Sequence, residues 1–219
     1  MRYTLCLFLM LSLACSDKEA AKSFTSLQTV QQRIVNGQTE TGYPAVGALA
    51  LETGRLGFLG AFCSASLIAP QWVLTAAHCI DGAREQAGEL GFSFNDWHVH
   101  FVTGSNAQFS PNLFGPAPRP SGVTLHPAAE IFMHPNYVSD SPLQSNDVAL
   151  IRLTEPISNV QPLPIFRDDL TSFEGQQLTY VGFGTSDPSV QDGSRSGVKR
   201  ITRLTLDTVG ADQYVSRHD

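Results

Sequence analysis

Short apolar runs separated by turn residues dominate the chain from residue 34 onward. β-Branched and aromatic residues concentrate in segments of strand length, and Gly and Pro residues punctuate the stretches between them. No window of ten or more residues shows a clear apolar stripe of helical period. The pattern therefore predicts an all-β fold, either a sandwich or a barrel. The expected strands are residues 45–51, 57–68, 72–75, 97–103, 131–133, 148–153, 178–182 and 198–206.

Two regions of the chain lack this pattern. Residues 16–32 show no sustained period, which is typical of a linker or a pro-segment. Residues 104–122 contain four prolines among Asn, Ser and Gly, so we expect a long surface loop inserted between strands.

The N-terminus has the pattern of a secretion signal. Arg2 precedes an apolar run over residues 5–14, which is too short to span a bilayer, and the small residues Ser12 and Ala14 predict cleavage after residue 14. The same stretch resembles the lipobox of bacterial lipoproteins, in which Cys15 would carry the lipid. Two locations stay open: secretion to the extracellular space or periplasm, and attachment to the outer membrane through a lipid on Cys15.

Charge and composition limit the kinds of partner that the chain is expected to bind. The chain has 14 Lys and Arg against 20 Asp and Glu, a net charge of −6, and 42% hydrophobic residues. This apolar content excludes a disordered polyelectrolyte. No three basic residues stand in a row, so we expect no nucleic-acid partner.

Of the four cysteines, Cys63 and Cys79 lie inside the expected strand region. In an oxidising compartment such a pair is expected to form a disulfide, with two buried free thiols as the alternative. The pair is not expected to bind zinc, because a zinc site needs more Cys or His residues at ligand spacing than the pair offers. His98, His100 and His126 are not expected to bind a metal either, because histidines on strand surfaces are far commoner than metal ligands. We expect no cofactor.

Two residues have the chemistry of a nucleophilic relay. His78 follows a strand that ends in small residues (LTAAHC, residues 74–79), and Asp147 stands at the mouth of a buried strand (SNDVALI, residues 145–151). An imidazole, with an ordinary pKa of about 6.5, can take the proton of a hydroxyl at neutral pH. A neighbouring carboxylate fixes the tautomer of that ring and stabilises its protonated form.

These motifs resemble the trypsin/chymotrypsin-like serine endopeptidases, from residue 33 to about residue 185. The resemblance includes RIVNG at residues 33–37, the spacing from Cys63 to Cys79, HPNY at residues 134–137, and YVGFG at residues 180–184, where Phe183 replaces the usual Trp. It implies a double β-barrel. Residues 34–165 would form a complete first barrel, and residues 166–219 would form only the opening strands of the second.

The resemblance also implies roles for individual residues. His78 matches the general base, Asp147 matches the carboxylate that orients it, and Cys63–Cys79 matches the disulfide beside the base. Arg33 and Ile34 match the site where the zymogen is cleaved, so residues 15–33 would be the pro-segment that activation removes. Protein or peptide substrates and a monomeric state follow from the same resemblance.

One motif of the family is missing. The nucleophilic Ser of these enzymes stands in a Gly-Asp-Ser-Gly-Gly turn, and no such turn occurs in the chain. Ser194 and Ser196 are poor substitutes, because they fall where the family has a surface loop. We therefore expect a serine endopeptidase whose nucleophile is absent from this chain, as in a fragment or truncated product. The alternative is a non-catalytic homologue that acts as an extracellular binding module.

Overall fold

The computed structural model describes residues 37–89, 93–139, 146–185, 196–210 and 214–217, all of which belong to the unit formed by residues 32–219. The signal segment, the linker, Cys15, Arg33, Ile34 and Ser194 lie outside the described residues.

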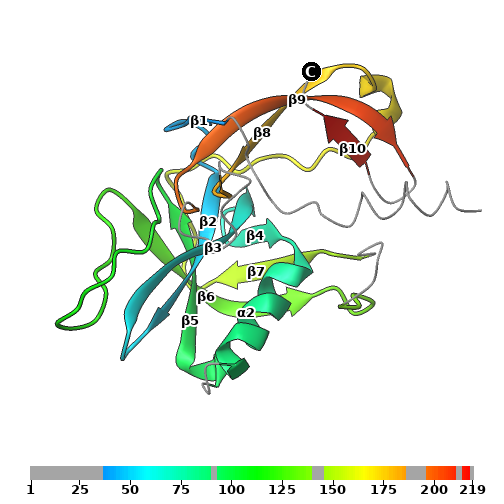
Figure 1. The fold of residues 1–219 in the computed structure, drawn as a ribbon. Helices are drawn as coiled ribbons and strands as arrows, with labels where there is room; N and C mark the ends of the chain where they lie inside the picture. The colour runs from blue at the N-terminus through cyan, green and yellow to red at the C-terminus, as the bar shows by residue number, and fades with distance from the viewer. Residues whose placement is uncertain (1–36, 90–92, 140–145, 186–195, 211–213, 218–219) are drawn as a thin grey trace, which may run out of the picture. The chain divides into compact units, whose positions relative to one another are not determined.

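Six strands close into an antiparallel barrel, as Figure 1 shows. In this barrel each strand is hydrogen-bonded to two neighbours, so no edge is left open. The barrel confirms the all-β prediction. Around it the order is β2 (Val46–Thr53), β3 (Gly57–Ala69), β4 (Trp72–Thr75), β7 (Ala149–Leu153), β6 (Thr124–Met133) and β5 (Trp97–Thr103).

Strand β2 is buried on both of its faces. Leu49, which is fully buried, belongs to the main apolar cluster together with residues from the other barrel strands. The neighbouring Ala48 and Ala50 face a second, smaller cluster that includes Phe58 and Phe183. Because alternate residues of a strand point to opposite faces, β2 carries large side chains on one face and alanines on the other.

The remaining strands form a second, four-stranded sheet around β9 (Arg200–Val209). Strand β8 (Gln177–Gly182) pairs with residues 200–205 of β9 along one edge. Strands β1 (Gln38–Thr39) and β10 (Tyr214–Arg217) pair with the other edge. Neither β1 nor β10 was among the expected strands.

Lys199 and Phe183 connect this sheet to the barrel region. The Lys199 side chain is 1% exposed, and its ammonium donates to the carbonyls of Gly42 and Tyr43 at 3.2 and 3.1 Å. Burial lowers the pKa of Lys199, and the nearby Glu40 opposes that shift. The backbone N–H of Phe183 donates to the Ser64 hydroxyl on β3 at 2.8 Å.

The structure contains a helix that the predicted strands leave out, so the fold is mostly β rather than purely β. Helix α2 (Ala77–Glu89) follows β4 directly, with short 3₁₀ turns at Phe94–Asp96 and Leu170–Phe173 elsewhere in the chain. Four of the five buried positions of α2 are Ala or Cys, and only Ile80 is large. A stripe of such small side chains gives a weak helical signal, especially with Gly82 and Gly88 between them.

The loop over residues 104–122 is more than a surface connection. Ala107 is fully buried and Ala117 is 8% exposed, and both are bonded to β3 or to the turn before it. The Ala107 carbonyl accepts from Ala61 N at 2.9 Å, while Ala117 accepts from Phe58 N at 3.0 Å and donates to Leu56 O at 2.8 Å. The loop therefore covers the alanine face of β2.

Arg119 fixes the end of this loop to the barrel. Its guanidinium donates to both oxygens of Glu52 on β2, at 2.7 and 2.6 Å, and this contact lowers the pKa of the Glu52 carboxyl. His100 on β5 is buried, with Nε2 at 3.1 Å from Glu52 Oε2. Burial lowers the pKa of His100 more than Glu52 raises it.

The approach of the loop to Gly57 gives a test of the packing. We expect Gly57→Ala to lower the free energy of unfolding by about 3 kcal/mol, because Gly57 has a φ of 76° and a Cβ there would collide with the Ala117 carbonyl. The matched control is Gly122→Ala, where φ is 73° but no atom lies within 4 Å of the added Cβ. The control should lose only about 1 kcal/mol in urea unfolding. Equal losses would contradict the close packing.

The buried histidines predict a pH dependence of stability. The pKa of His100 and that of His126 are both lowered by burial, so the unfolded chain takes up protons first as the pH falls. Stability is therefore fully present well above the ordinary pKa of about 6.5 and decreases below it. We expect a lower melting temperature at pH 5.5 than at pH 7.5, and His100→Gln should reduce this difference. A melting temperature that rises on acidification would contradict the assignment.

Candidate active site

The pairing of β4 with β7 creates the site. Thr75, the last residue of β4, lies opposite Ala149, the first residue of β7. The strands are antiparallel, so the segment leaving β4 and the segment entering β7 meet at the same end of the barrel. His78 comes from the first segment and Asp147 from the second.

Local bonds hold each of these segments. The Thr75 hydroxyl donates to Ser64 O at 3.0 Å, which fixes the end of β4, and α2 starts two residues later. On the other side Asn146 has a φ of 60°, a left-handed conformation that Asn tolerates better than most residues. Its side-chain amide donates to Asn136 O at 3.3 Å. This turn sets the direction in which Asp147 leaves the backbone.

His78 and Asp147 share two bonds. The backbone N–H of His78 donates to Asp147 Oδ1 at 2.8 Å, and ring Nδ1 lies 2.6 Å from Oδ2. An ionised carboxylate only accepts hydrogen bonds, so Nδ1 carries the proton and Nε2 is the nitrogen able to take one up. The His78 side chain is 32% exposed and that of Asp147 is 17% exposed, so solvent or a ligand can reach the imidazole while the carboxylate is mostly covered.

A disulfide holds the first turn of α2. Cys63 on β3 and Cys79 on α2 are bonded, with 6.0 Å between their Cα atoms, which confirms the expected pairing. Cys79 is 3% exposed and follows His78 directly, so the bond ties the imidazole's own backbone to the barrel. Cys79 Sγ lies 3.6 Å from His78 Nε2.

The chain was compared with known proteins. The family model named Trypsin matches residues 34–217, most of the chain. The chain belongs to the trypsin family.

Individual relatives support the assignment. Phenoloxidase-activating factor 3 of Holotrichia diomphalia is 28% identical over 172 residues, which is 76% of this chain and 47% of that protein. CLIP domain-containing serine protease B10 of Anopheles gambiae is 30% identical over 168 residues, 72% and 44% of the two chains. Vitamin K-dependent protein C of Mus musculus is 26% identical over 190 residues, 84% and 35%. The chain spans less than half the length of each of these relatives.

The other candidate site residues of this trypsin-family chain do not all lie together in one site. Ser196 is half-buried and precedes Gly197, whose N–H donates to Phe183 O at 2.8 Å, so it belongs to the approach to β9. Of the histidines considered as ligands, His98 is exposed, His100 is buried against Glu52, and His126 lies 3.0 Å from the Thr103 hydroxyl.

One set of atoms has the spacing of metal ligands. Cys63 Sγ, Cys79 Sγ and one ring nitrogen of His78 lie within 4.8 Å of one another, and no other such group occurs in the described part of the chain. Both sulfur atoms are used by the disulfide, so neither offers the thiolate that a zinc ion needs.

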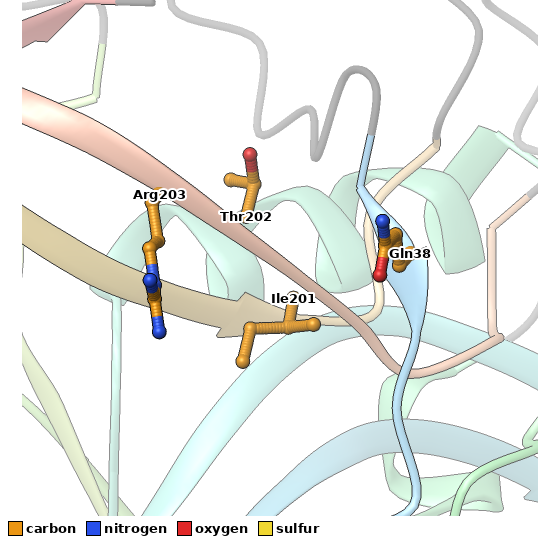
Figure 2. A pocket seen from close by; sticks show the side chains of 4 residues that line it. All are labelled: Gln38, Ile201, Thr202 and Arg203. Atoms are coloured by element: carbon orange, nitrogen blue, oxygen red, sulfur yellow. The ribbon is translucent and has the colours of Figure 1, made fainter.

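A cavity beside β1 and β9 is not predicted by the sequence. The cavity, of about 390 Å³, is lined by Gln38 of β1 and by Ile201, Thr202 and Arg203 of β9, whose side chains Figure 2 shows. Neither His78 nor Asp147 lines it. The pairing of β1 with β9 brings Gln38 next to residues 201–203. A local sequence pattern does not predict pairing between segments so far apart in the chain.

Within the described ranges no helix has the length and apolar character needed to cross a bilayer.

The disulfide predicts a measurable contribution to stability. We expect Cys63→Ala combined with Cys79→Ala to lower the free energy of unfolding by about 3 kcal/mol, because the bond closes a loop between residues 16 apart in sequence. Urea unfolding followed by circular dichroism measures the loss. Dithiothreitol should lower the stability of the unsubstituted protein to a similar value and leave the double variant unchanged. A double variant as stable as the unsubstituted chain would contradict the prediction.

Proposed function

We propose that this chain belongs to a serine endopeptidase that cleaves peptide bonds by acyl transfer. The observation that carries the proposal is the His78–Asp147 pair, in which the carboxylate binds both the ring Nδ1 and the backbone N–H of the same histidine. Such double contact fixes the ring before any substrate arrives. In a Ser-His-Asp relay a carboxylate of this kind holds the imidazole in the tautomer and orientation that general-base catalysis uses.

In the proposed mechanism Nε2 of His78 takes the proton from a serine hydroxyl as its oxygen attacks the peptide carbonyl. Asp147, partly buried beside Nδ1, stabilises the imidazolium that forms. The imidazolium then gives the proton to the leaving amine, and a water molecule hydrolyses the acyl-enzyme in a second cycle through the same nitrogen.

The proposal assigns the nucleophile to no residue of this chain. Neither Ser194 nor Ser196 stands in a Gly-Asp-Ser-Gly-Gly turn. We therefore expect residues 1–219 alone to be inactive. Membership of the trypsin family supports a serine endopeptidase rather than a non-catalytic binding module.

Secretion and activation complete the proposal. The apolar residues 5–14 would direct export, with Cys15 as the residue that a lipid would modify. Cleavage after Arg33 would release the ammonium group of Ile34, which in this mechanism pairs with a carboxylate next to the nucleophile. The substrates would be proteins or peptides in an extracellular or periplasmic compartment.

The decisive experiment combines the gene with the protein. We expect the codons that follow residue 219 to encode a Gly-Asp-Ser-Gly-Gly turn, and the protein containing it, once activated, to hydrolyse peptide substrates. His78→Ala should lower kcat about a millionfold and Asp147→Asn about ten-thousandfold, because the amide no longer enforces the correct tautomer. His126→Asn, a histidine outside the pair, serves as the control and should retain activity.

A fluorophosphonate probe separates the alternatives. It should label the protein that contains the turn and leave residues 1–219 unlabelled. Labelling of the 219-residue chain would contradict the missing nucleophile. A stop codon after residue 219 would instead favour the non-catalytic binding module.

A further inference from the structure

The tip of the loop over residues 104–122 displays two large apolar side chains. Leu113 is 91% exposed and Phe114 is 98% exposed, the highest values among the large hydrophobic residues that the structure describes. Phe109, in the same loop, is 50% exposed. Adjacent apolar side chains in this state are costly in water and indicate an interaction surface.

The tip is held in this exposed position. Asn112 Oδ1 accepts from Phe114 N at 3.1 Å, and Asn112 Nδ2 donates to Pro116 O at 3.2 Å, so one side chain closes the turn from both sides. Below the tip, the buried Ala107 and Ala117 bond the two ends of the loop to the barrel. In Figure 1 the loop, drawn in green, extends away from the barrel strands.

The distribution of charge along the loop is specific. From residue 105 to residue 118 the chain contains no Asp, Glu, Lys, Arg or His. Two arginines lie at the base, and one of them, Arg119, is paired with Glu52 through both carboxylate oxygens. Arg119 ends the neutral stretch, and the exposed Arg55 lies in the hairpin turn whose next residue, Leu56, accepts a hydrogen bond from Ala117. A neutral apolar tip above two arginines is thus fixed on one side of the barrel.

We propose that this tip docks on a phospholipid bilayer, inserting Leu113 and Phe114 into the interfacial region. The interface accepts apolar and aromatic side chains but penalises charged ones, which matches a tip without a single charge. Arg55, at the base, would lie at the level of the lipid phosphates, where guanidinium groups are favoured.

The insertion is shallow and reversible. Two side chains bury far less apolar surface than a spanning helix, so binding of this kind assists a second attachment rather than replacing it. The lipid considered for Cys15 would be such an attachment, but the docking of the tip depends neither on that lipid nor on the proposed protease activity.

Sedimentation with vesicles tests the proposal on the full chain. Every variant carries Cys15→Ser, so that no lipid on that residue contributes, and is mixed with vesicles of phosphatidylcholine alone or of phosphatidylcholine and phosphatidylglycerol in a three-to-one ratio. We expect Leu113→Ser with Phe114→Ser to lower the partition coefficient about tenfold for each side chain removed. The matched control, Val138→Ser with Ile165→Ser, removes two exposed apolar side chains elsewhere and should bind as the parent does.

A tryptophan at the tip reports insertion directly. The emission of Phe114→Trp should shift to shorter wavelength on binding vesicles and be quenched by brominated phosphatidylcholine, whereas the protein with only Trp72 and Trp97 should show neither change. An unshifted, unquenched tip tryptophan would overturn the proposal, as would equal sedimentation of the parent and the Leu113/Phe114 variant. Loss of binding to a protein partner in that variant, without any vesicle binding, would assign the tip to a protein instead.

Discussion

The antiparallel pairing of β4 with β7 is the constraint on which the candidate site depends. It places Thr75 beside Ala149 and so brings together two segments that are far apart in sequence. Once that pairing is made, the only freedom left to His78 and Asp147 lies in the short connections to their strands. The disulfide to Cys79 removes that freedom on one side, and the Asn146 turn removes it on the other.

Close packing explains why β2 carries alanines on one face. Ala48 and Ala50 are fully buried beneath Phe183 and the Ala107 region of the loop, so larger side chains there would push these segments outward. The loop consequently has two functions in the architecture. Its ends supply backbone hydrogen bonds and small side chains that complete a minor core, and its middle is left to project into solvent with Leu113 and Phe114.

The features that depend on short stretches of sequence could be predicted from the sequence. Strand β4 was expected at its observed bounds, and the Cys63–Cys79 bond followed from having only two cysteines in the folded region. Helix α2 was missed because four of its five buried positions are Ala or Cys, so its apolar stripe contains only one large side chain, that of Ile80. The cavity at Gln38 was missed for another reason: it arises from pairing between β1 and β9, and a two-residue strand has no periodicity to detect.

The proposed base and its carboxylate are held by contacts within the six-stranded barrel and the segments next to its strands. Three bonds that orient them, from the Thr75 hydroxyl to Ser64, from Asp147 to His78 and from Cys63 to Cys79, join residues between β3 and β7. The second sheet contacts this assembly through Phe183 N and the Ser64 hydroxyl, one residue from the disulfide. A rigid proton acceptor can therefore form within a closed barrel, and the second sheet can be held in register with it through β3. Positioning the base is thus physically separate from supplying the nucleophile.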